Sequence, residues 1–482
     1  MAEAGENVSA LPGRPGNLTP EQEEKLRKFW EMFLQICGVL DEDGVDGDTN
    51  VPSEQGKAAV AGSDKPKKKT LNPFKKRKDK SKESKSAEKD AAESTAAVKE
   101  NDPEDKWGET KAYHETLAKH PPEEIRATIW AMVKHDNPDA LLLRFLRARK
   151  WDLQRALVMM VSTMNWRASE MRVESDVVVN GEEHASIDEG SSDEAVKERA
   201  EDFLAQMRIG KSYCYGIDKA GRPICVCRAR LHRAGEQSES SLERYTVYLI
   251  ETTRFLLSPP VDTACVVFDL TGFSLANMDY SPVKFMIKCF EANYPESLGA
   301  VLVHKAPWVF QGVWRIIRGW LDPVVASKVH FTNNVKDLEE FIAKDKLPDE
   351  MDGTSGWSYK YIEPIPGEND KMKDTDTRDK LIQERKALYE EFESKTIEWI
   401  REDDATKRAA LNSERSAIAH KLREQYWRLD PYIRSRTLYD RIGVIKPNGS
   451  LDYYPAWEAV GTSNGAAAVA EAAVETSSDD VD

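Results

Sequence analysis

The chain has 482 residues and a formal net charge of −15 at pH 7, with 40% hydrophobic and 32% charged residues. This composition is typical of a soluble protein with a core, and no apolar run reaches the ~20 residues that a membrane-spanning helix needs. The acidic balance argues against general nucleic-acid binding. Six cysteines are too few for a disulfide scaffold, so we expect reduced, buried thiols and a cytoplasmic protein without a secretory signal.

Residues 18–37 predict an N-terminal helix that packs on another part of the protein. Thr19, Pro20 and Gln22 form a capping-box start, and apolar side chains then recur at helical spacing. Residues 39–105 have almost no aromatic side chains and many charged ones. Such a segment buries too little apolar surface to offset its chain entropy, so we expect a disordered linker.

A basic block interrupts this linker at residues 65–85, which hold eleven Lys or Arg against two acidic residues. Three interpretations stay open: a solvated charge run, a nuclear import signal, or attraction to an anionic membrane surface. The third interpretation predicts a peripheral membrane protein. Its cations would be Lys67, Lys68, Lys69, Lys75, Lys76, Arg77 and Lys78.

The next part of the chain predicts an α/β protein. Residues 118–168 form a helical lobe, with two helices in 139–167, and an acidic loop is expected at 169–197. Within 198–358, a hairpin at 211–231 precedes strands at 264–272, 300–306 and 327–333 that alternate with helices. This order favours a mixed, mostly parallel sheet.

The C-terminal part differs in composition. Residues 370–457 predict a helical extension, in which charged helices at 376–429 lie as a pair on the domain rather than in a long coiled coil, because no heptad is sustained. The acidic tail at 460–482 is expected to be disordered.

Five motifs in register carry a family resemblance: LLRFLRARKWDLQRA, GIDKAGRPI, FDLTGFS, NYPESLG and LDPVVASK. Between about 118 and 350 the chain resembles the CRAL-TRIO lipid-binding family, and most of all its non-classical fungal phosphatidylinositol-transfer proteins. The resemblance implies a CRAL-TRIO fold, in which a helical lobe precedes an α/β lobe. The sheet of that lobe floors an apolar pocket for one phospholipid, under a movable gate helix.

The resemblance also implies a site for the phosphatidylinositol headgroup at Arg149, Lys150, Glu296 and Lys328. Cations suit the phosphodiester, and a carboxylate can accept hydrogen bonds from inositol hydroxyls. A threonine of the family pattern is replaced by Val325, which removes one hydrogen bond of about 1 kcal/mol. The alternative is that Arg149 and Lys150 simply cap a helix C-terminus, where cations are favoured.

The segment KAPWVFQGVWRIIRGWLDPVVASK falls where the family has its gate. One face of its helix carries Trp308, Phe310, Val313, Trp314, Ile317, Trp320 and Leu321. Aromatic rings suit both a lipid pocket and a membrane interface, so we interpret this face as the gate. An ordinary amphipathic core helix is the alternative.

The pocket lining departs from the family pattern. Ala264 and Val266 replace hydroxyl residues, and Cys214 and Cys225 replace tyrosines; Cys227 shares their face of the sheet by strand alternation. Choline-lipid binding is therefore in doubt, and a second, more apolar ligand such as a sterol, squalene or haem stays open. The cysteines match no zinc pattern, so we expect no metal and no cofactor other than bound lipid.

The sequence therefore predicts a lipid-transfer protein that binds phosphatidylinositol and a second lipid. GTSNG at 461–465 matches the Gly-x-Ser-x-Gly pattern without the strand and helix that a nucleophile elbow requires, so we expect no enzyme. The alternative function is a lipid-regulated sensor or scaffold that presents the C-terminal helices to a protein partner.

Overall fold

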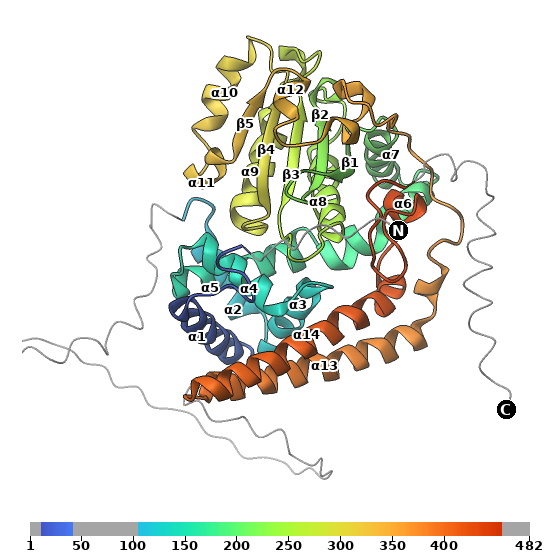
Figure 1. Cartoon of the computed structure of the whole chain (residues 1–482). Helices are drawn as coiled ribbons and strands as arrows, with labels where there is room; N and C mark the ends of the chain where they lie inside the picture. The colour runs from blue at the N-terminus through green and yellow to red at the C-terminus, as the bar shows by residue number, and fades with distance from the viewer. Residues whose placement is uncertain (1–10, 42–104, 456–482) are drawn as a thin grey trace, which may run out of the picture.

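The computed structural model describes residues 11–41 and 105–455. A helical lobe lies below an α/β lobe, and two long C-terminal helices cross the bottom of the molecule (Figure 1). The basic block and the expected tail at 460–482 lie outside the described residues, as does nearly all of the expected linker at 39–105.

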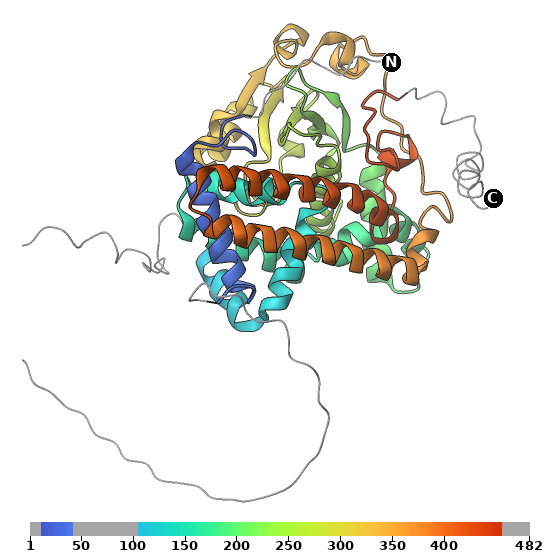
Figure 2. The same ribbon diagram turned by 60° about the horizontal axis from the view of Figure 1, so that its bottom comes forward.

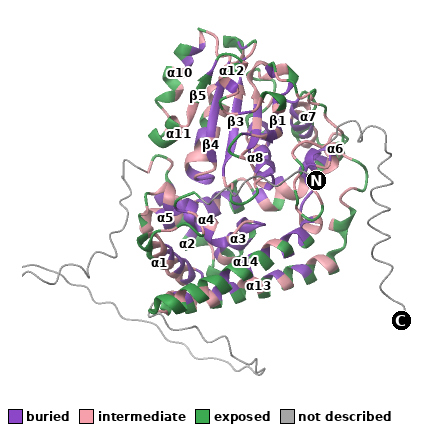
Figure 3. Ribbon diagram, in the orientation of Figure 1, coloured by how far each residue is buried: buried purple, intermediate pink, exposed green. Residues whose placement is uncertain are grey.

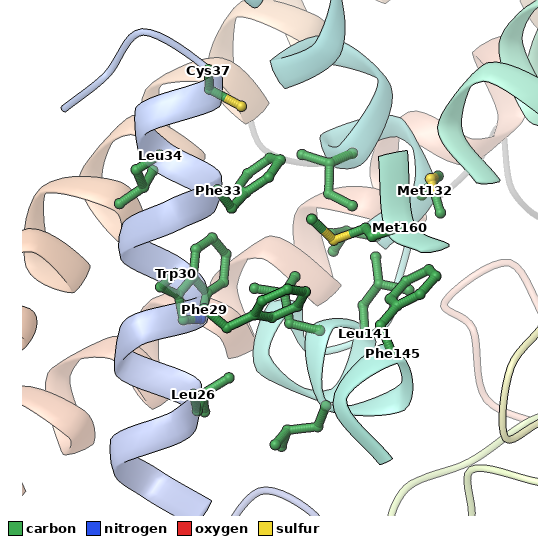
Figure 4. Packing of buried hydrophobic residues seen from close by; sticks show 14 of the residues in the cluster. Leu26, Phe29, Trp30, Phe33, Leu34, Cys37, Met132, Leu141, Phe145 and Met160 are labelled. Atoms are coloured by element: carbon green, nitrogen blue, oxygen red, sulfur yellow. The ribbon is translucent and has the colours of Figure 1, made fainter. Parts of the chain in front are cut away.

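Five helices form the helical lobe: α1 (Pro20–Ile36), α2 (Glu109–Lys119), α3 (Pro122–Val133), α4 (Pro138–Ala148) and α5 (Leu153–Asn165). The predicted capping box is confirmed at α1, where Thr19 and Gln22 exchange backbone–side-chain hydrogen bonds of 3.1 and 3.2 Å. Phe29, Trp30 and Phe33 of this helix point toward the side chains of α4 and α5 (Figure 4). The N-terminal helix is therefore part of the core of this lobe.

The α/β lobe contains one sheet with strand order β1-β2-β3-β4-β5. The predicted hairpin is confirmed, since β1 and β2 pair antiparallel, and β2 to β5 are parallel. The strands are β1 (Ser212–Ile217), β2 (Pro223–Arg228), β3 (Ala264–Asp269), β4 (Leu298–His304) and β5 (Val329–Thr332). The helices are α6 (Val179–Asp188), α7 (Glu194–Arg208), α8 (Glu239–Phe255), α9 (Tyr280–Lys288), α10 (Phe310–Arg318), α11 (Pro323–Ser327) and α12 (Val335–Leu338).

The expectation of a loop at 169–197 was wrong. This stretch forms a π-helical turn at Val173–Val178 and then α6. Glu182 is fully buried and accepts hydrogen bonds from the Tyr361 hydroxyl (2.9 Å) and the Leu438 backbone N–H (2.9 Å). The acidic side chain of Glu182 thus forms buried hydrogen bonds with segments far away in the chain, and the composition of 169–197 cannot reveal this.

The C-terminal extension contains α13 (Thr375–Arg401), α14 (Ala405–Ile433) and α15 (Leu438–Arg441). The long helices α13 and α14 run side by side beneath the helical lobe, as the expected pair, and α1 crosses them (Figure 2). Their outer faces are exposed, whereas the central strands β3 and β4 are mostly buried (Figure 3). In the described part of the chain, no helix combines the length and apolar character needed to cross a membrane.

Candidate lipid-binding site

A cavity of about 280 Å³ lies between the sheet, α8, α9 and α10. Apolar side chains make up most of its wall. Branched and aromatic residues on alternate strand positions form the floor, as expected for a face of a parallel sheet. The apolar wall includes Leu242, Leu249, Val266, Phe268, Val283, Met286, Ile287, Phe290, Val301, Val303, Phe310, Trp314 and Ile317.

Five of the six residues expected on the pocket wall line this cavity: Cys225, Cys227, Ala264, Val266 and Val325. Cys214 lies elsewhere. It pairs with Cys225 across the hairpin, but Tyr439 of α15 covers it: the Cys214 backbone N–H donates to the Tyr439 hydroxyl oxygen at 2.6 Å. The Cys214 sulfur lies 3.4 Å from the Thr253 hydroxyl, and its hydrogen bond with Cys225 lowers the pKa of the Cys214 thiol.

The expected gate helix is shorter than the segment that suggested it. The helix α10 ends at Arg318, and a turn carries the chain to α11 (Figure 1). Four gate residues line the cavity, namely Phe310, Trp314, Ile317 and Leu321. Val313 is buried in a cluster with Phe310, Trp314 and Ile317, and Trp320 packs edge-on against Tyr280.

Trp308 differs from the other gate residues. It precedes α10 and is 87% exposed, and Ile316 on the outer side of the helix is 45% exposed. The segment therefore has two apolar surfaces, one that closes the cavity and one that faces away from it.

The structure brings two of the four expected headgroup residues together. Glu296 precedes β4 and Lys328 precedes β5, so the parallel strands place both at their amino ends, where a Lys328 Nζ to Glu296 Oε2 distance of 3.7 Å forms an ion pair. Ser297 and Val329, their chain neighbours, line the cavity. Arg144 of α4 fixes the backbone next to this ion pair, since its guanidinium donates to the Glu296 carbonyl oxygen at 3.0 Å and to the Asp262 carbonyl oxygen at 2.6 Å.

Arg149 and Lys150, the other two expected headgroup residues, directly follow α4 and differ in their contacts. The Arg149 guanidinium donates to both carboxylate oxygens of Glu109, at 2.6 and 2.7 Å. Burial raises the pKa of Glu109, and Arg149 counteracts that effect. Lys150 has a left-handed φ of 52°, is exposed, and has no side-chain hydrogen bond or ion pair within residues 11–41 and 105–455.

Sequence reasoning missed Glu291, which joins the helical lobe to the gate. Its carboxylate accepts from the Asp322 backbone N–H at 2.7 Å, from Lys106 Nζ at 2.7 Å and from Trp107 Nε1 at 3.1 Å. Lys106 also donates to the Trp320 carbonyl oxygen. Its hydrogen-bond partners lie far from Glu291 in the chain, so no local sequence pattern could identify Glu291 as the residue that connects them.

Comparisons with known proteins agree with this architecture. The model of the CRAL/TRIO domain matches residues 207–353, and that of the CRAL/TRIO N-terminal domain matches residues 74–162. A CRAL-TRIO domain-containing protein of Schizosaccharomyces pombe, C3H8.02, is 40% identical over 91% of this chain and 93% of its own length.

Two relatives are named as transfer proteins. Phosphatidylinositol transfer protein CSR1 of Eremothecium gossypii is 38% identical over 91% of this chain and 99% of its own length. The phosphatidylinositol/phosphatidylcholine transfer protein SFH4 of Arabidopsis thaliana is 27% identical over 44% of this chain and 35% of its own length. The resemblance seen in the sequence is therefore confirmed, and the chain belongs to the CRAL-TRIO family.

Proposed function

We propose that this protein binds single molecules of phosphatidylinositol and transfers them between membranes. The observation that carries the proposal is an apolar cavity whose wall includes Ser297 and Val329, the chain neighbours of the Glu296–Lys328 ion pair. Acyl chains fit the apolar wall, because their burial removes hydrocarbon from water. The relative CSR1, which matches over nearly its whole length, is named a phosphatidylinositol transfer protein.

The headgroup chemistry follows from the charges at the amino ends of β4 and β5. At 3.7 Å the Glu296 and Lys328 side chains are too far apart for a hydrogen bond, so each keeps its hydrogen-bonding capacity for a ligand. Lys328 donates to the phosphodiester, and Glu296 accepts from inositol hydroxyls. Lys150 supplies a second cation, and Arg149 shares its guanidinium between Glu109 and the phosphate.

Exchange requires that the gate leave the cavity. The inner face of α10 covers the lipid in the closed form, while Trp308, just before the helix, and Ile316 on its outer side meet the membrane. Indole rings partition favourably into the membrane interface, and the exposed Arg315 and Arg318 can meet lipid phosphates. The cations of the basic block, Lys67–Lys69 and Lys75–Lys78, bring the protein to an anionic surface.

Mass spectrometry of bound lipid tests this proposal. Full-length protein is incubated with vesicles of mixed phosphatidylinositol and phosphatidylcholine, reisolated and extracted. We expect phosphatidylinositol on the wild type and a loss of at least about tenfold on a Lys150→Ala/Lys328→Ala variant, since two charge-assisted hydrogen bonds disappear. The control is Lys421→Ala, an exposed lysine on α14, which should load as the wild type does. Equal loading of the double variant would overturn the headgroup assignment.

A further inference from the structure

The end of the cavity opposite the Glu296–Lys328 pair has polar groups of its own. Gln206 lies in the last turn of α7, and Lys211 directly precedes β1, where its carbonyl oxygen accepts a hydrogen bond from the Arg228 N–H at the carboxyl end of β2. Both side chains line the cavity, together with His232 from the turn after β2. A six-residue strand spans roughly 20 Å, so this cluster lies about that far from the proposed headgroup site.

The Gln206 amide lacks one hydrogen-bond partner. Its side chain is 0% exposed, and its Nε2 donates to the Asp202 carbonyl oxygen at 3.1 Å. This bond fixes the orientation of the amide, and its Oε1 has no partner within residues 11–41 and 105–455. A buried acceptor without a donor is unfavourable and uncommon, so this oxygen needs an N–H or O–H from a bound molecule.

Lys211 supplies a donor at the same end of the cavity. A helix C-terminal motif holds the two residues together, since the Lys211 N–H bonds the Gln206 carbonyl oxygen at 3.0 Å and Gly210 takes a left-handed φ of 63°. The Lys211 ammonium donates to Gln237 Oε1 at 2.6 Å and lies 3.4 Å from His232 Nδ1. Since an ammonium has three N–H groups, one remains for a ligand.

The charge around Lys211 selects among ligand classes. Burial lowers the pKa of Lys211 to about 8, while Cys227, Glu236 and Asp202 raise it, so the cation already has acidic neighbours. His232 in turn lies 3.4 Å from an Asp279 carboxylate oxygen. A ligand carboxylate cannot donate to Gln206 Oε1 and would add a negative charge next to these acids. A hydroxyl both donates and accepts, so it satisfies Gln206 and Lys211 together.

We propose that Gln206 and Lys211 form a subsite for the hydroxyl group of a neutral long-chain lipid, which is the second ligand of this cavity. The proposal rests on the proposed function, because it assumes that the cavity carries lipid. The hydroxyl sits at the carboxyl end of the sheet, and the hydrocarbon chain runs toward the amino end. The two ligands therefore occupy the cavity in opposite orientations, and each excludes the other.

The test compares three probes of equal chain length: 1-octadecanol, octadecane and octadecanoic acid. Full-length protein is incubated with phosphatidylcholine vesicles that contain the probes in equal amounts, and the retained probes are quantified by mass spectrometry. We expect the wild type to retain 1-octadecanol over octadecane by at least about tenfold. Gln206→Leu and Lys211→Met should each bring this ratio close to one.

Two controls separate this subsite from the proposed headgroup site and from misfolding. Thr246→Val changes a cavity residue whose hydroxyl already bonds the Leu242 carbonyl oxygen, and it should keep the wild-type ratio. Phosphatidylinositol loading of Gln206→Leu should stay at the wild-type level, which also shows that the variant folds. Loss of phosphatidylinositol transfer with intact 1-octadecanol selectivity would instead reject the proposed function and keep the subsite.

Three results would overturn the subsite. The first is equal retention of 1-octadecanol and octadecane by the wild type, as when water satisfies Gln206. Preferential retention of octadecanoic acid would assign the cluster to carboxylates. Retention of none of the three probes would show that the cavity does not take long-chain lipids in this orientation.

Discussion

At the scale of single residues, Asp139 joins three parts of the chain. Its carboxylate accepts from Trp30 Nε1 of α1 at 2.7 Å and from both terminal nitrogens of Arg415 of α14, at 2.6 and 3.1 Å. The Arg415 side chain is 1% exposed. A buried carboxylate needs such a partner, because desolvation strongly disfavours an isolated charge.

We expect Arg415→Met to lower the free energy of unfolding by roughly 3–5 kcal/mol, since Asp139 loses its buried cation. Urea denaturation measures the change. Arg428 lies on the same helix, but its side chain is 62% exposed and pairs with Glu384 at 3.0 Å. Arg428→Met should therefore cost less than about 1 kcal/mol, and equal losses for the two variants would contradict this account.

Glu368 predicts a pH dependence of stability. Burial raises its pKa from 4.5 to about 7, with Glu182 and Glu183 acting in the same direction, while Arg441, at 2.9 Å, lowers it. The folded state thus holds a proton that the unfolded state has released. As the pH rises from about 5 to 8, this group should reduce the free energy of unfolding, by roughly 3 kcal/mol in total.

Glu368→Gln should remove that contribution. Denaturation curves at pH 5 and pH 8 should lie closer together for the variant than for the wild type. A variant whose loss of stability between the two pH values equals that of the wild type would show that Glu368 is not the titrating group.

At the scale of elements, Glu291 holds the end of the gate segment. It bonds the Asp322 N–H that begins α11 and the Lys106 and Trp107 side chains that precede α2. The side chain of Glu291 is 7% exposed, which makes these bonds stronger than surface contacts. The proposed opening of the gate, by movement of α10 and α11, would have to break them.

We expect Glu291→Ala to speed lipid exchange between vesicles several-fold, because the closed form loses these hydrogen bonds. The identity of the bound lipid should not change. Glu340→Ala, at an exposed site after α12, serves as the control and should exchange at the wild-type rate. Slower exchange by the Glu291 variant would show that these bonds support opening rather than closure.

The elements also show what the sequence could and could not predict. The Asp218–Gly221 turn and the branched run before Asp269 identify the hairpin and β3, because turn chemistry and β-propensity are local properties. Strand alternation correctly placed Cys225 and Cys227 on one face. Cys214 shares that face, but α15 covers it, and nothing near Cys214 in the chain encodes that cover.

In the candidate site, too, the sequence could predict some contacts and not others. Lys328 and Glu296 come together because both precede strands of one parallel sheet, which the sequence pattern implies. The partner of Arg149 is Glu109, forty positions earlier, so its bond could not be predicted. Side-chain partners across lobes depend on packing between elements, which local patterns do not contain.

At the scale of the whole molecule, the C-terminal extension completes the core of the helical lobe. Phe392, Trp399 and Leu422 belong to the same buried cluster as Trp30 and Phe33. Trp130 of α3 stacks on Tyr389 with 4.9 Å between ring centroids. The extension is thus an integral part of the fold and not an appendage.

We expect a chain that ends at residue 358 to lose solubility, because the aromatic surface of α1 and α3 would face water. The soluble fraction after expression and the cooperativity of thermal unfolding measure this. A chain that ends at residue 455 keeps every described element and should behave as the full-length protein does. A soluble, cooperatively folded chain of 358 residues would contradict the assignment of a shared core.

This arrangement also sets the order of events during synthesis. The apolar residues of α1 leave the ribosome first, while their partners on α13 and α14 follow more than 350 residues later. At ~10 residues per second that interval is roughly half a minute. Throughout it Trp30 lacks its ring contact with Phe392 of α13, so we expect the newly made protein to depend on molecular chaperones until α13 has been made.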